Sequence, residues 1–167
     1  LEEGLAYPCF LTEDEISAIR EQQEREKIAP GIYAGWSKYR DWDKDTAIEA
    51  EIVSRIKAGE PFVIRLKSNG VPNASAEETA RHTVNDAIRG ELSVPDNFLD
   101  VVIIKQTGIP TYHFAHVVDD HLMRTTHVVR GEEWLPSLPI HVELFEDLGW
   151  DLPVYCHTAQ LMKIGTS

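Results

Sequence analysis

The chain has 167 residues, which is enough for one domain or for one domain and part of a second. Hydrophobic residues make up 43% of it, which predicts a packed core and excludes a chain that is disordered throughout. The net charge of −12 disfavours non-specific binding to nucleic acid, although it leaves room for a small basic groove on an acidic surface.

Membrane and disulfide-rich classes are also disfavoured. No apolar run approaches the roughly 20 residues that span a bilayer, and no segment resembles a signal peptide. The two cysteines, Cys9 and Cys156, lie far apart and outside any C-x-x-C pair, which indicates a reducing, cytoplasmic setting. The chain begins at Leu1 without a methionine and ends in Gly-Thr-Ser, so we expect it to be part of a longer protein.

Two helices are predicted near the start of the chain. Thr12 and Glu15 form a capping-box pattern for a helix that runs towards Pro30 and is largely exposed, because its apolar stripe is thin. Residues 46–58 predict a second helix, with isoleucines at every fourth position and Gly59 as its stop.

The segment between these helices, residues 29–42, is an aromatic loop. Its Lys38 and Arg40 lie beside Trp36 and Tyr39, a combination that could stack on a nucleotide or neutralise its phosphate. The same residues also suit a loop that is held in place by its own aromatic side chains.

Strands are predicted next. Residues 61–67 form one strand, and residues 82–94 read as strand, tight turn and strand, with Gly90 at the bend. Arg65, Lys67 and Arg89 could line a positive surface here, although a lone basic residue on a strand is often simply solvated.

The pattern changes after Asn97. A continuous apolar run at 99–105 is typical of a strand buried on both faces. Strand and helix then alternate up to a last strand, which is the βαβ pattern of a parallel sheet; the later segments are a helix at 114–123, a strand at 125–129, a helix at 137–149 and a strand at 152–158. Three strands are too few for a complete doubly wound domain. We therefore predict an α/β fold, in which a mixed α/β region is followed by half of a parallel sheet.

The stretch 112–134 holds four histidines, two aspartates, two glutamates and two arginines. His113, His116 and Asp120 have spacings that could place metal ligands on one helix face, but such spacings are common and no H-E-x-x-H is present. An acid/base pair is weakened because the adjacent Asp119 and Asp120 would point about 100° apart on a helix.

A pocket for a charged substrate fits this stretch better. We expect Tyr112 at the end of one strand and Arg130 at the end of the next, where open α/β sheets bind ligands. A hydroxyl and a guanidinium suit a carboxylate. Glu132 and Glu133 follow at a helical start, where they could hold ribose hydroxyls or an amine. On spacing alone, Arg130 could equally pair with Glu133.

Longer blocks resemble a known family. The run from Asp100 to Trp150, "DVVIIKQTGIPTYHFAHVVDDHLMRTTHVVRGEEWLPSLPIHVELFEDLGW", is similar to bacterial glutamyl-tRNA synthetases, which are class I aminoacyl-tRNA synthetases. The segments "GLAYPCFLTEDEI", "GEPFVIRLK" and "DAIRGELSV" resemble the domain inserted in their catalytic domain. The resemblance covers essentially the whole chain.

The resemblance implies a division of the chain. Residues 1–99 would be the insertion that binds the tRNA acceptor stem, and residues 100–167 the second half of the Rossmann-type catalytic domain. The H-I-G-H-type ATP motif would lie before Leu1, and the K-M-S-K-S-type loop after the last residue. The chain would then carry no catalytic residue of its own, and we expect it to be inactive alone.

The resemblance also implies roles for single residues. Tyr112, Arg130 and His116 would bind L-glutamate, with His116 standing where the family often has asparagine. ATP would contact Glu133 and the segment at Leu161 and Met162. Zinc is not expected, because the C-x-C pair that some members use is replaced by Cys9-Phe10-Leu11.

The implied activity is that of a glutamate–tRNA ligase, which forms glutamyl-adenylate from ATP with Mg²⁺ and transfers glutamate to the end of tRNA(Glu). The candidate tRNA contacts are Trp36, Lys38, Arg40, Arg65 and Arg89. A cytoplasmic, monomeric parent without a membrane partner is expected. Two alternatives stay open: a metal-dependent hydrolase that uses His113, His116 and Asp120, and a stand-alone RNA-binding module.

Overall fold

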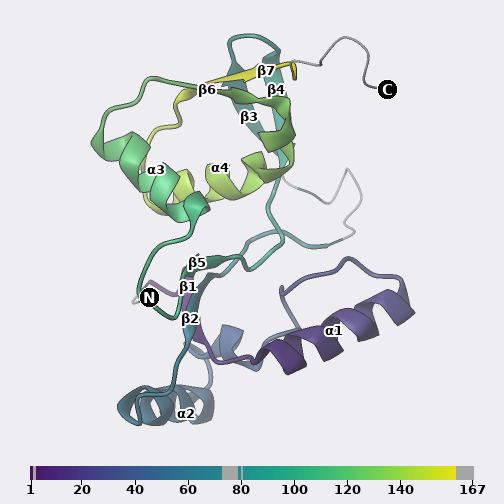
Figure 1. Cartoon of the computed structure of the whole chain (residues 1–167), viewed down its shortest axis with the longest axis vertical. Helices are drawn as coiled ribbons and strands as arrows, with labels where there is room; N and C mark the ends of the chain where they lie inside the picture. Colours follow the sequence, from purple (N-terminus) through teal and green to yellow (C-terminus); the bar gives the residue numbers. More distant parts are fainter. Residues whose placement is uncertain (2, 73–78, 80, 161–167) are drawn as a thin grey trace.

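The computed structural model describes residues 1, 3–72, 79 and 81–160, which form two sheets and four α-helices (Figure 1). In chain order the elements are β1 (Ala6–Cys9), α1 (Glu13–Glu26), the 3-10 helix η1 (Lys38–Asp41), α2 (Thr46–Lys57), β2 (Val63–Leu66), β3 (Arg81–Asp86), β4 (Gly90–Pro95), β5 (Val102–Ile104), α3 (Tyr112–Leu122), β6 (His127–Gly131), the 3-10 helix η2 (Glu132–Ser137), α4 (Leu138–Asp147) and β7 (Val154–Thr158).

The two sheets differ in strand direction. One has the order β1-β2-β5 and is antiparallel throughout. The other has the order β4-β3-β7-β6, in which β7 pairs in parallel with both β3 and β6. Helices α3 and α4 lie between the two sheets in the view of Figure 1. The mixed α/β class and the parallel pairing that the sequence predicts are confirmed.

One strand lies in a different sheet from the predicted one. The apolar run at 99–105 forms only the short strand β5, which pairs antiparallel with β2, so its placement in the parallel sheet is wrong. An apolar run shows that a strand is buried but does not select its partner. Pairings of β2 with β5 and of β3 with β7 join segments from both sides of residue 99. The division of the chain at that point stays a prediction.

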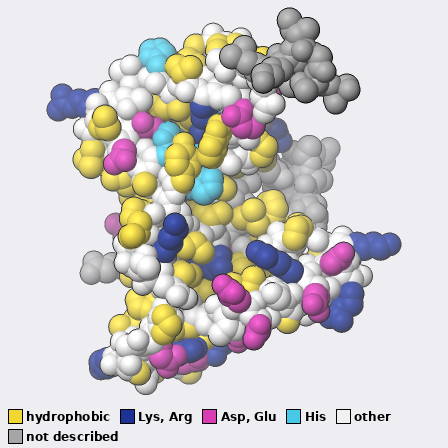
Figure 2. Space-filling model, in the orientation of Figure 1, with side chains coloured by type: hydrophobic (Ala, Val, Ile, Leu, Met, Phe, Trp, Pro, Cys, Tyr) yellow, Lys and Arg dark blue, Asp and Glu magenta, His cyan; other side chains and the backbone are white. Residues whose placement is uncertain are grey.

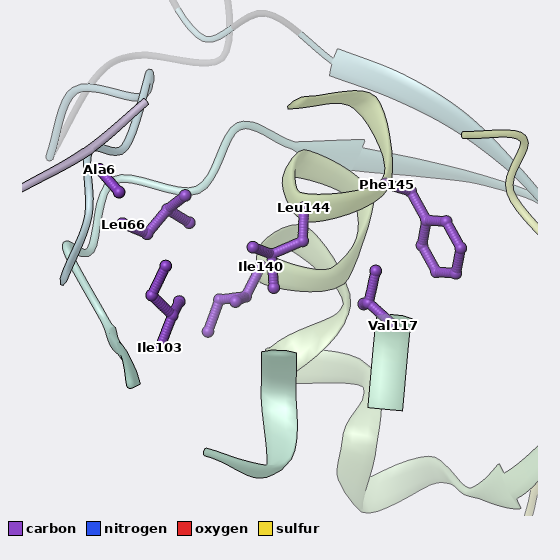
Figure 3. Packing of buried hydrophobic residues seen from close by; sticks show 7 residues of the cluster. All are labelled: Ala6, Leu66, Ile103, Val117, Ile140, Leu144 and Phe145. Carbon is purple, nitrogen blue, oxygen red and sulfur yellow. The ribbon is translucent and has the colours of Figure 1, made fainter. Parts of the chain in front are cut away.

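The core is organised around α4, in which seven of ten residues are buried. In Figure 3, side chains of the antiparallel sheet and of α3 surround Ile140 and Leu144 of this helix. Its Leu138 and Val142 pack instead against the four-stranded sheet, in a cluster that includes Val128 of β6 and Tyr155 of β7. A helix that is apolar on two faces is stabilised only when both faces are covered, so α4 holds the two sheets together.

Local signals in the sequence are largely confirmed. The Thr12–Glu15 capping box is present at α1, whose only buried residue is Gln23. Gly90 adopts a φ of 80° at the end of the β3–β4 turn, a conformation that glycine tolerates without strain. In α2 the predicted apolar face is narrower than expected, because Ile52 is buried while Ile56 is 41% exposed.

Two helix starts differ from the predictions. Ser137 precedes α4, but its side chain makes no capping hydrogen bond, since the helix continues directly from η2. Tyr112 is the first residue of α3 rather than the end of a strand. The strand before it ends at Ile104, and an isolated antiparallel β-bridge joins Ile104 to Pro110 just before the helix begins.

A buried polar network fastens the first sheet to the η1 segment. Asp100 accepts hydrogen bonds from the Tyr7 hydroxyl at 2.9 Å, from Arg40 Nε at 3.0 Å and from the Ser68 backbone N–H at 3.0 Å. Arg65 donates to the Asp100 carbonyl at 2.8 Å. Burial, followed by the Asp100 charge, raises the pKa of Tyr7 well above its usual range.

Membrane insertion finds no support in the helices. Within the described ranges, none is both long and apolar enough to cross a bilayer. Cys9 and Cys156 are both free and buried.

The Asp100 network predicts a large loss of stability on truncation. Asp100→Ala removes the charge that faces Arg40 and leaves several buried donors without an acceptor, so the free energy of unfolding should fall by about 3–5 kcal/mol. Urea denaturation of this chain measures it. Lys38→Ala, which breaks an exposed pair with Glu51, is the control and should cost less than about 1 kcal/mol. Equal losses would show that the Asp100 network does not stabilise the fold.

Glu143 predicts a pH-dependent contribution. Its carboxylate accepts from the Asn69 N–H and from Asn97 Nδ2, both at 2.6 Å, yet burial raises the pKa of Glu143 to about 7. The fold thus disfavours the ionised form, so the contribution of Glu143 is fully present below its unfolded pKa and is lost as pH rises through about 7. In the unsubstituted chain, this effect should lower the free energy of unfolding by about 2–3 kcal/mol between pH 5 and pH 8. In Glu143→Gln, whose side chain does not ionise, this decrease should be absent.

The exposed Glu49→Gln is the control for this experiment, and it should leave the pH profile of the unfolding free energy unchanged. If Glu143→Gln has the same profile as the unsubstituted chain, then Glu143 ionises in the folded state without a cost.

Candidate active site

Polar side chains converge where three neighbouring strands of the four-stranded sheet end. Arg130 on β6 is paired in register with His157 on β7, and Asp86 is the last residue of β3. Helix α4 brings His141 to the same place, and α3 adds His113. The carboxyl ends of parallel strands are the usual ligand-binding edge of an open α/β sheet.

The Arg130 guanidinium is held by two imidazole rings. Its Nε donates to His157 Nε2 at 2.9 Å, and its Nη1 donates to His141 Nδ1 at 3.0 Å. Its Cζ lies 4.8 Å from the centre of the Tyr155 ring. The third nitrogen, Nη2, is buried and has no hydrogen-bond partner among the described residues.

The two rings must be neutral to accept these hydrogen bonds. Arginine nitrogens only donate, so His157 Nε2 and His141 Nδ1 each present a lone pair. His157 therefore carries its proton on Nδ1, which lies 2.6 Å from Asp86 Oδ2. His141 carries its proton on Nε2 and donates to His113 Nδ1 at 3.0 Å. Burial, and then the nearby charge of Arg130, lowers the pKa of His141 to about 2.

Asp86 stays ionised in this network. Burial alone would raise the pKa of Asp86, but hydrogen bonds from the backbone N–H of Arg89, from the His157 ring and from the backbone N–H of Ile88 lower it to about 2. The burial of Arg130 lowers its pKa from the ordinary value, although arginine stays charged at neutral pH.

Tyr112 and His116 lie on the exposed side of this cluster. The two rings are stacked at 5.6 Å, and Trp134 packs against Tyr112 at 4.8 Å. The His116 ring is also 4.9 Å from that of His141, which bonds Arg130, so the three residues that the sequence singles out for glutamate lie in one continuous cluster. In Figure 2, histidine side chains (cyan) reach the surface over this upper part of the molecule.

His116 has one nitrogen available. Its Nδ1 lies 2.9 Å from Asp120 Oδ2, while its Nε2 is buried without a described partner. Burial lowers the pKa of His116, so the ring is neutral at pH 7. The nearby charge of Asp120 favours the proton on Nδ1, although Asp120 Oδ2 accepts no hydrogen bond from the described residues, and Nε2 then carries the lone pair.

The pairing of Arg130 with Glu133, an alternative on spacing alone, is not found among the described contacts. The Glu133 carboxylate folds back over Gly131, where an added Cβ would clash with its Oε2. Gln160 Nε2 donates to the same oxygen at 3.4 Å. Glu133 is exposed at the start of η2, beside the end of β6. Leu161 and Met162 lie outside the described residues.

The metal hypothesis gains no support from the geometry. His113 Nδ1 faces His141, and His116 Nδ1 faces Asp120, so the candidate ligands are directed to different partners. Over residues 3–72 and 81–160, no three His, Cys, Asp or Glu side chains form a group that could hold a metal ion.

The candidate tRNA contacts do not form one surface. Arg40 and Arg65 point inward to the Asp100 network. Lys38 pairs with Glu51, and Trp36 is half-buried. Arg89 pairs with Glu132 near the Arg130 cluster. Lys and Arg side chains are interleaved with Asp and Glu over the lower part of the molecule (Figure 2).

Sequence reasoning missed three members of the cluster: Asp86, His141 and His157. All three are fully or almost fully buried. A histidine or an aspartate near the carboxyl end of a strand was the available signal, but Asp86 and His157 are 71 residues apart and no local spacing connects them.

Comparison with known proteins identifies the family of the chain. The family model described as "tRNA synthetases class I (E and Q), catalytic domain" matches residues 1–166. A glutamate–tRNA ligase of Acetivibrio thermocellus is 56% identical over 164 residues, covering 98% of this chain and 28% of that protein. One from Clostridium perfringens is 53% identical, covering all of this chain and 29% of that protein.

Solved structures give the same result. A glutamate–tRNA ligase of Elizabethkingia meningosepticum, in complex with its amino acid, has a TM-score of 0.76 and 35% identity, covering 99% of this chain and 32% of that one. The chain thus spans less than a third of the length of these relatives. Its fold, its sequence and its matched residues place it in the class I glutamyl- and glutaminyl-tRNA synthetase family, within the catalytic domain.

Proposed function

We propose that the chain is the glutamate-binding part of a glutamate–tRNA ligase, which activates L-glutamate with ATP and transfers it to the 3′ end of tRNA(Glu). The observation that carries the proposal is the buried guanidinium of Arg130, whose hydrogen-bond partners among the described residues are neutral rings and whose buried Nη2 has no partner among those residues. The chain by itself is proposed to be inactive, as part of a longer enzyme.

A carboxylate is the ligand that this guanidinium suits. Two neutral imidazoles fix the plane of Arg130 without placing a negative charge in contact with it among the described residues, and a cation removed from water is stabilised by an anion with matching hydrogen-bond geometry. Glutamine would place a neutral amide there and would lose a charge-assisted hydrogen bond. Such a loss typically costs about 1.5–3 kcal/mol.

His116 and Tyr112 would bind other groups of the amino acid. The neutral His116 ring offers an acceptor at Nε2, which suits the ammonium group of an amino acid rather than a carboxylate. Tyr112, 53% exposed and stacked on His116, presents its ring and hydroxyl at the entrance.

ATP and tRNA are assigned on the family relationship. Glu133, exposed at the end of β6, is our candidate contact for ATP, which we expect to bring Mg²⁺ with it. Lys38 and Arg89 keep exposed basic groups that the acceptor end of tRNA could contact, whereas Arg40 and Arg65 are held within the fold by the Asp100 network. The buried, free cysteines agree with our expectation of a cytoplasmic location.

Catalysis by this part of the enzyme would consist of positioning. Arg130, His116 and Tyr112 hold the amino acid so that its carboxylate meets the α-phosphate of ATP, and holding reactants in place lowers the barrier. Groups that stabilise the developing charge on the phosphate are not assigned to the described residues.

Substitution of Arg130 tests the proposal. In the full-length ligase that contains this segment, Arg130→Ala should lower kcat/KM for glutamate at least tenfold in tRNA aminoacylation, because it removes a charge-assisted hydrogen bond, while KM for ATP changes little. Arg130→Lys, which keeps the charge but loses the planar fork, should have a similar effect.

The exposed Arg25→Ala on α1 is the matched control and should leave both constants unchanged. If Arg130→Ala alters only KM for ATP, or leaves glutamate kinetics intact in a folded enzyme, then Arg130 does not bind the amino acid and the proposal fails.

His116 predicts a pH dependence. Because burial lowers its pKa, His116 stays neutral, and KM for glutamate should be flat from pH 8 to pH 6.5. Below this range the ring becomes charged, loses its acceptor and repels the ammonium group, so KM should rise severalfold. His116→Asn keeps an acceptor that does not titrate and should abolish the rise; a rise that persists in the variant would assign it to another group.

A further inference from the structure

Asp86 is buried behind the proposed pocket and contacts no residue at its entrance. It lies at the end of β3, is 1% exposed, and faces His157, which is fully buried on β7. The ring of His157 in turn holds Arg130. Asp86 is therefore connected to the guanidinium through one histidine.

The backbone holds both oxygens of Asp86. Oδ1 accepts from the N–H groups of Ile88 and Arg89, each at 2.9 Å. Oδ2 accepts from the His157 backbone N–H at 3.1 Å and from His157 Nδ1 at 2.6 Å. With four donors around it, the carboxylate is an acceptor in a fixed place, and only a protonated Nδ1 can face it.

This contact decides which nitrogen of His157 carries the proton. With Nδ1 protonated, Nε2 has a lone pair and accepts from Arg130 Nε at 2.9 Å. In the other tautomer, Nε2–H would face the Nε–H of Arg130, and two donors would oppose each other. The guanidinium would then have to turn or to shift away from His157.

We propose that Asp86 is a positioning residue for amino-acid binding, which acts through the tautomer of His157 to aim the free Nη2 of Arg130 at the substrate carboxylate. The inference rests on the proposed function of Arg130. The inference gives the β3–β4 hairpin a role in amino-acid specificity. The family resemblance instead places this hairpin in the segment 1–99, which would bind tRNA.

A purely structural role for Asp86 is the alternative, since its Oδ1 also closes the turn after β3. Asp86→Asn separates the two roles. An asparagine keeps a carbonyl oxygen for the turn amides, but it places an NH₂ group opposite His157 Nδ1, which favours the wrong tautomer.

In the full-length ligase, Asp86→Asn should lower kcat/KM for glutamate 10- to 100-fold, the range seen when the outer partner of a metal-bound histidine is removed. KM for ATP should be unchanged. The ¹⁵N chemical shifts of His157 should move from a protonated Nδ1 to a protonated Nε2, which a loss of turn stability would not produce.

The fold offers a matched control. His82 and Asp96 form a second histidine–aspartate contact on the same hairpin, also at 2.6 Å, away from Arg130. Asp96→Asn should therefore leave kcat/KM for glutamate within about twofold, even where it lowers the melting temperature.

Coupling to Arg130 is the decisive measurement. If Asp86 acts through the guanidinium, Asp86→Asn should have no further effect on kcat/KM in an Arg130→Ala background. An equal loss in both backgrounds would overturn the inference. The inference would also be overturned if Asp86→Asn had normal glutamate kinetics while Arg130→Ala was impaired. If Arg130→Ala itself has no effect, the proposed function fails instead.

A second pair of variants covers the case in which Asp86→Asn does not fold. His157→Gln can donate to Asp86 and accept from Arg130, whereas His157→Leu can do neither. The Gln variant should keep a kcat/KM for glutamate at least tenfold above that of the Leu variant. Equal activities in the two variants would overturn the inference.

Discussion

The burial of helix α4 is the constraint on which the rest of the structure depends. Its apolar side chains fill the space beneath both sheets, so neither sheet has a complete core without it. Its two buried polar side chains, His141 and Glu143, must then find partners within the fold. Glu143 is bonded by Asn69 and Asn97, and His141 by Arg130. The helix that supports the core therefore also supports the proposed pocket.

The proposed pocket is built by holding a cation without neutralising it. A carboxylate beside Arg130 would have been the simplest internal partner, but it would have occupied the hydrogen-bonding positions that a substrate needs. Neutral imidazoles satisfy two nitrogens and leave the charge in place. Asp86 is separated from the guanidinium by His157. Such an arrangement favours an anionic ligand and disfavours a neutral analogue.

The acidic composition of the chain limits the number of basic side chains that could contact the phosphates of a nucleic acid. Lys38 and Arg89 are paired with glutamates, and Arg40 is paired with Asp100, so these three candidate tRNA contacts are already neutralised within the chain. Association with tRNA through so few phosphate contacts would depend only weakly on salt. The glutamate–tRNA ligases that match the chain are more than three times as long as it is.

The sequence by itself determined the features that depend on neighbours a few residues apart. These include the α1 capping box and the β3–β4 turn at Gly90. The glutamate-binding roles of Tyr112, His116 and Arg130 were expected from the family resemblance, and it is the fold that joins His116 to Arg130 through His141. Only the tertiary structure decided that β5 joins the antiparallel sheet, because strand pairing is a long-range choice among apolar partners. It alone decided the tautomer of His157, since a ring takes its proton position from whatever side chain the fold brings to it.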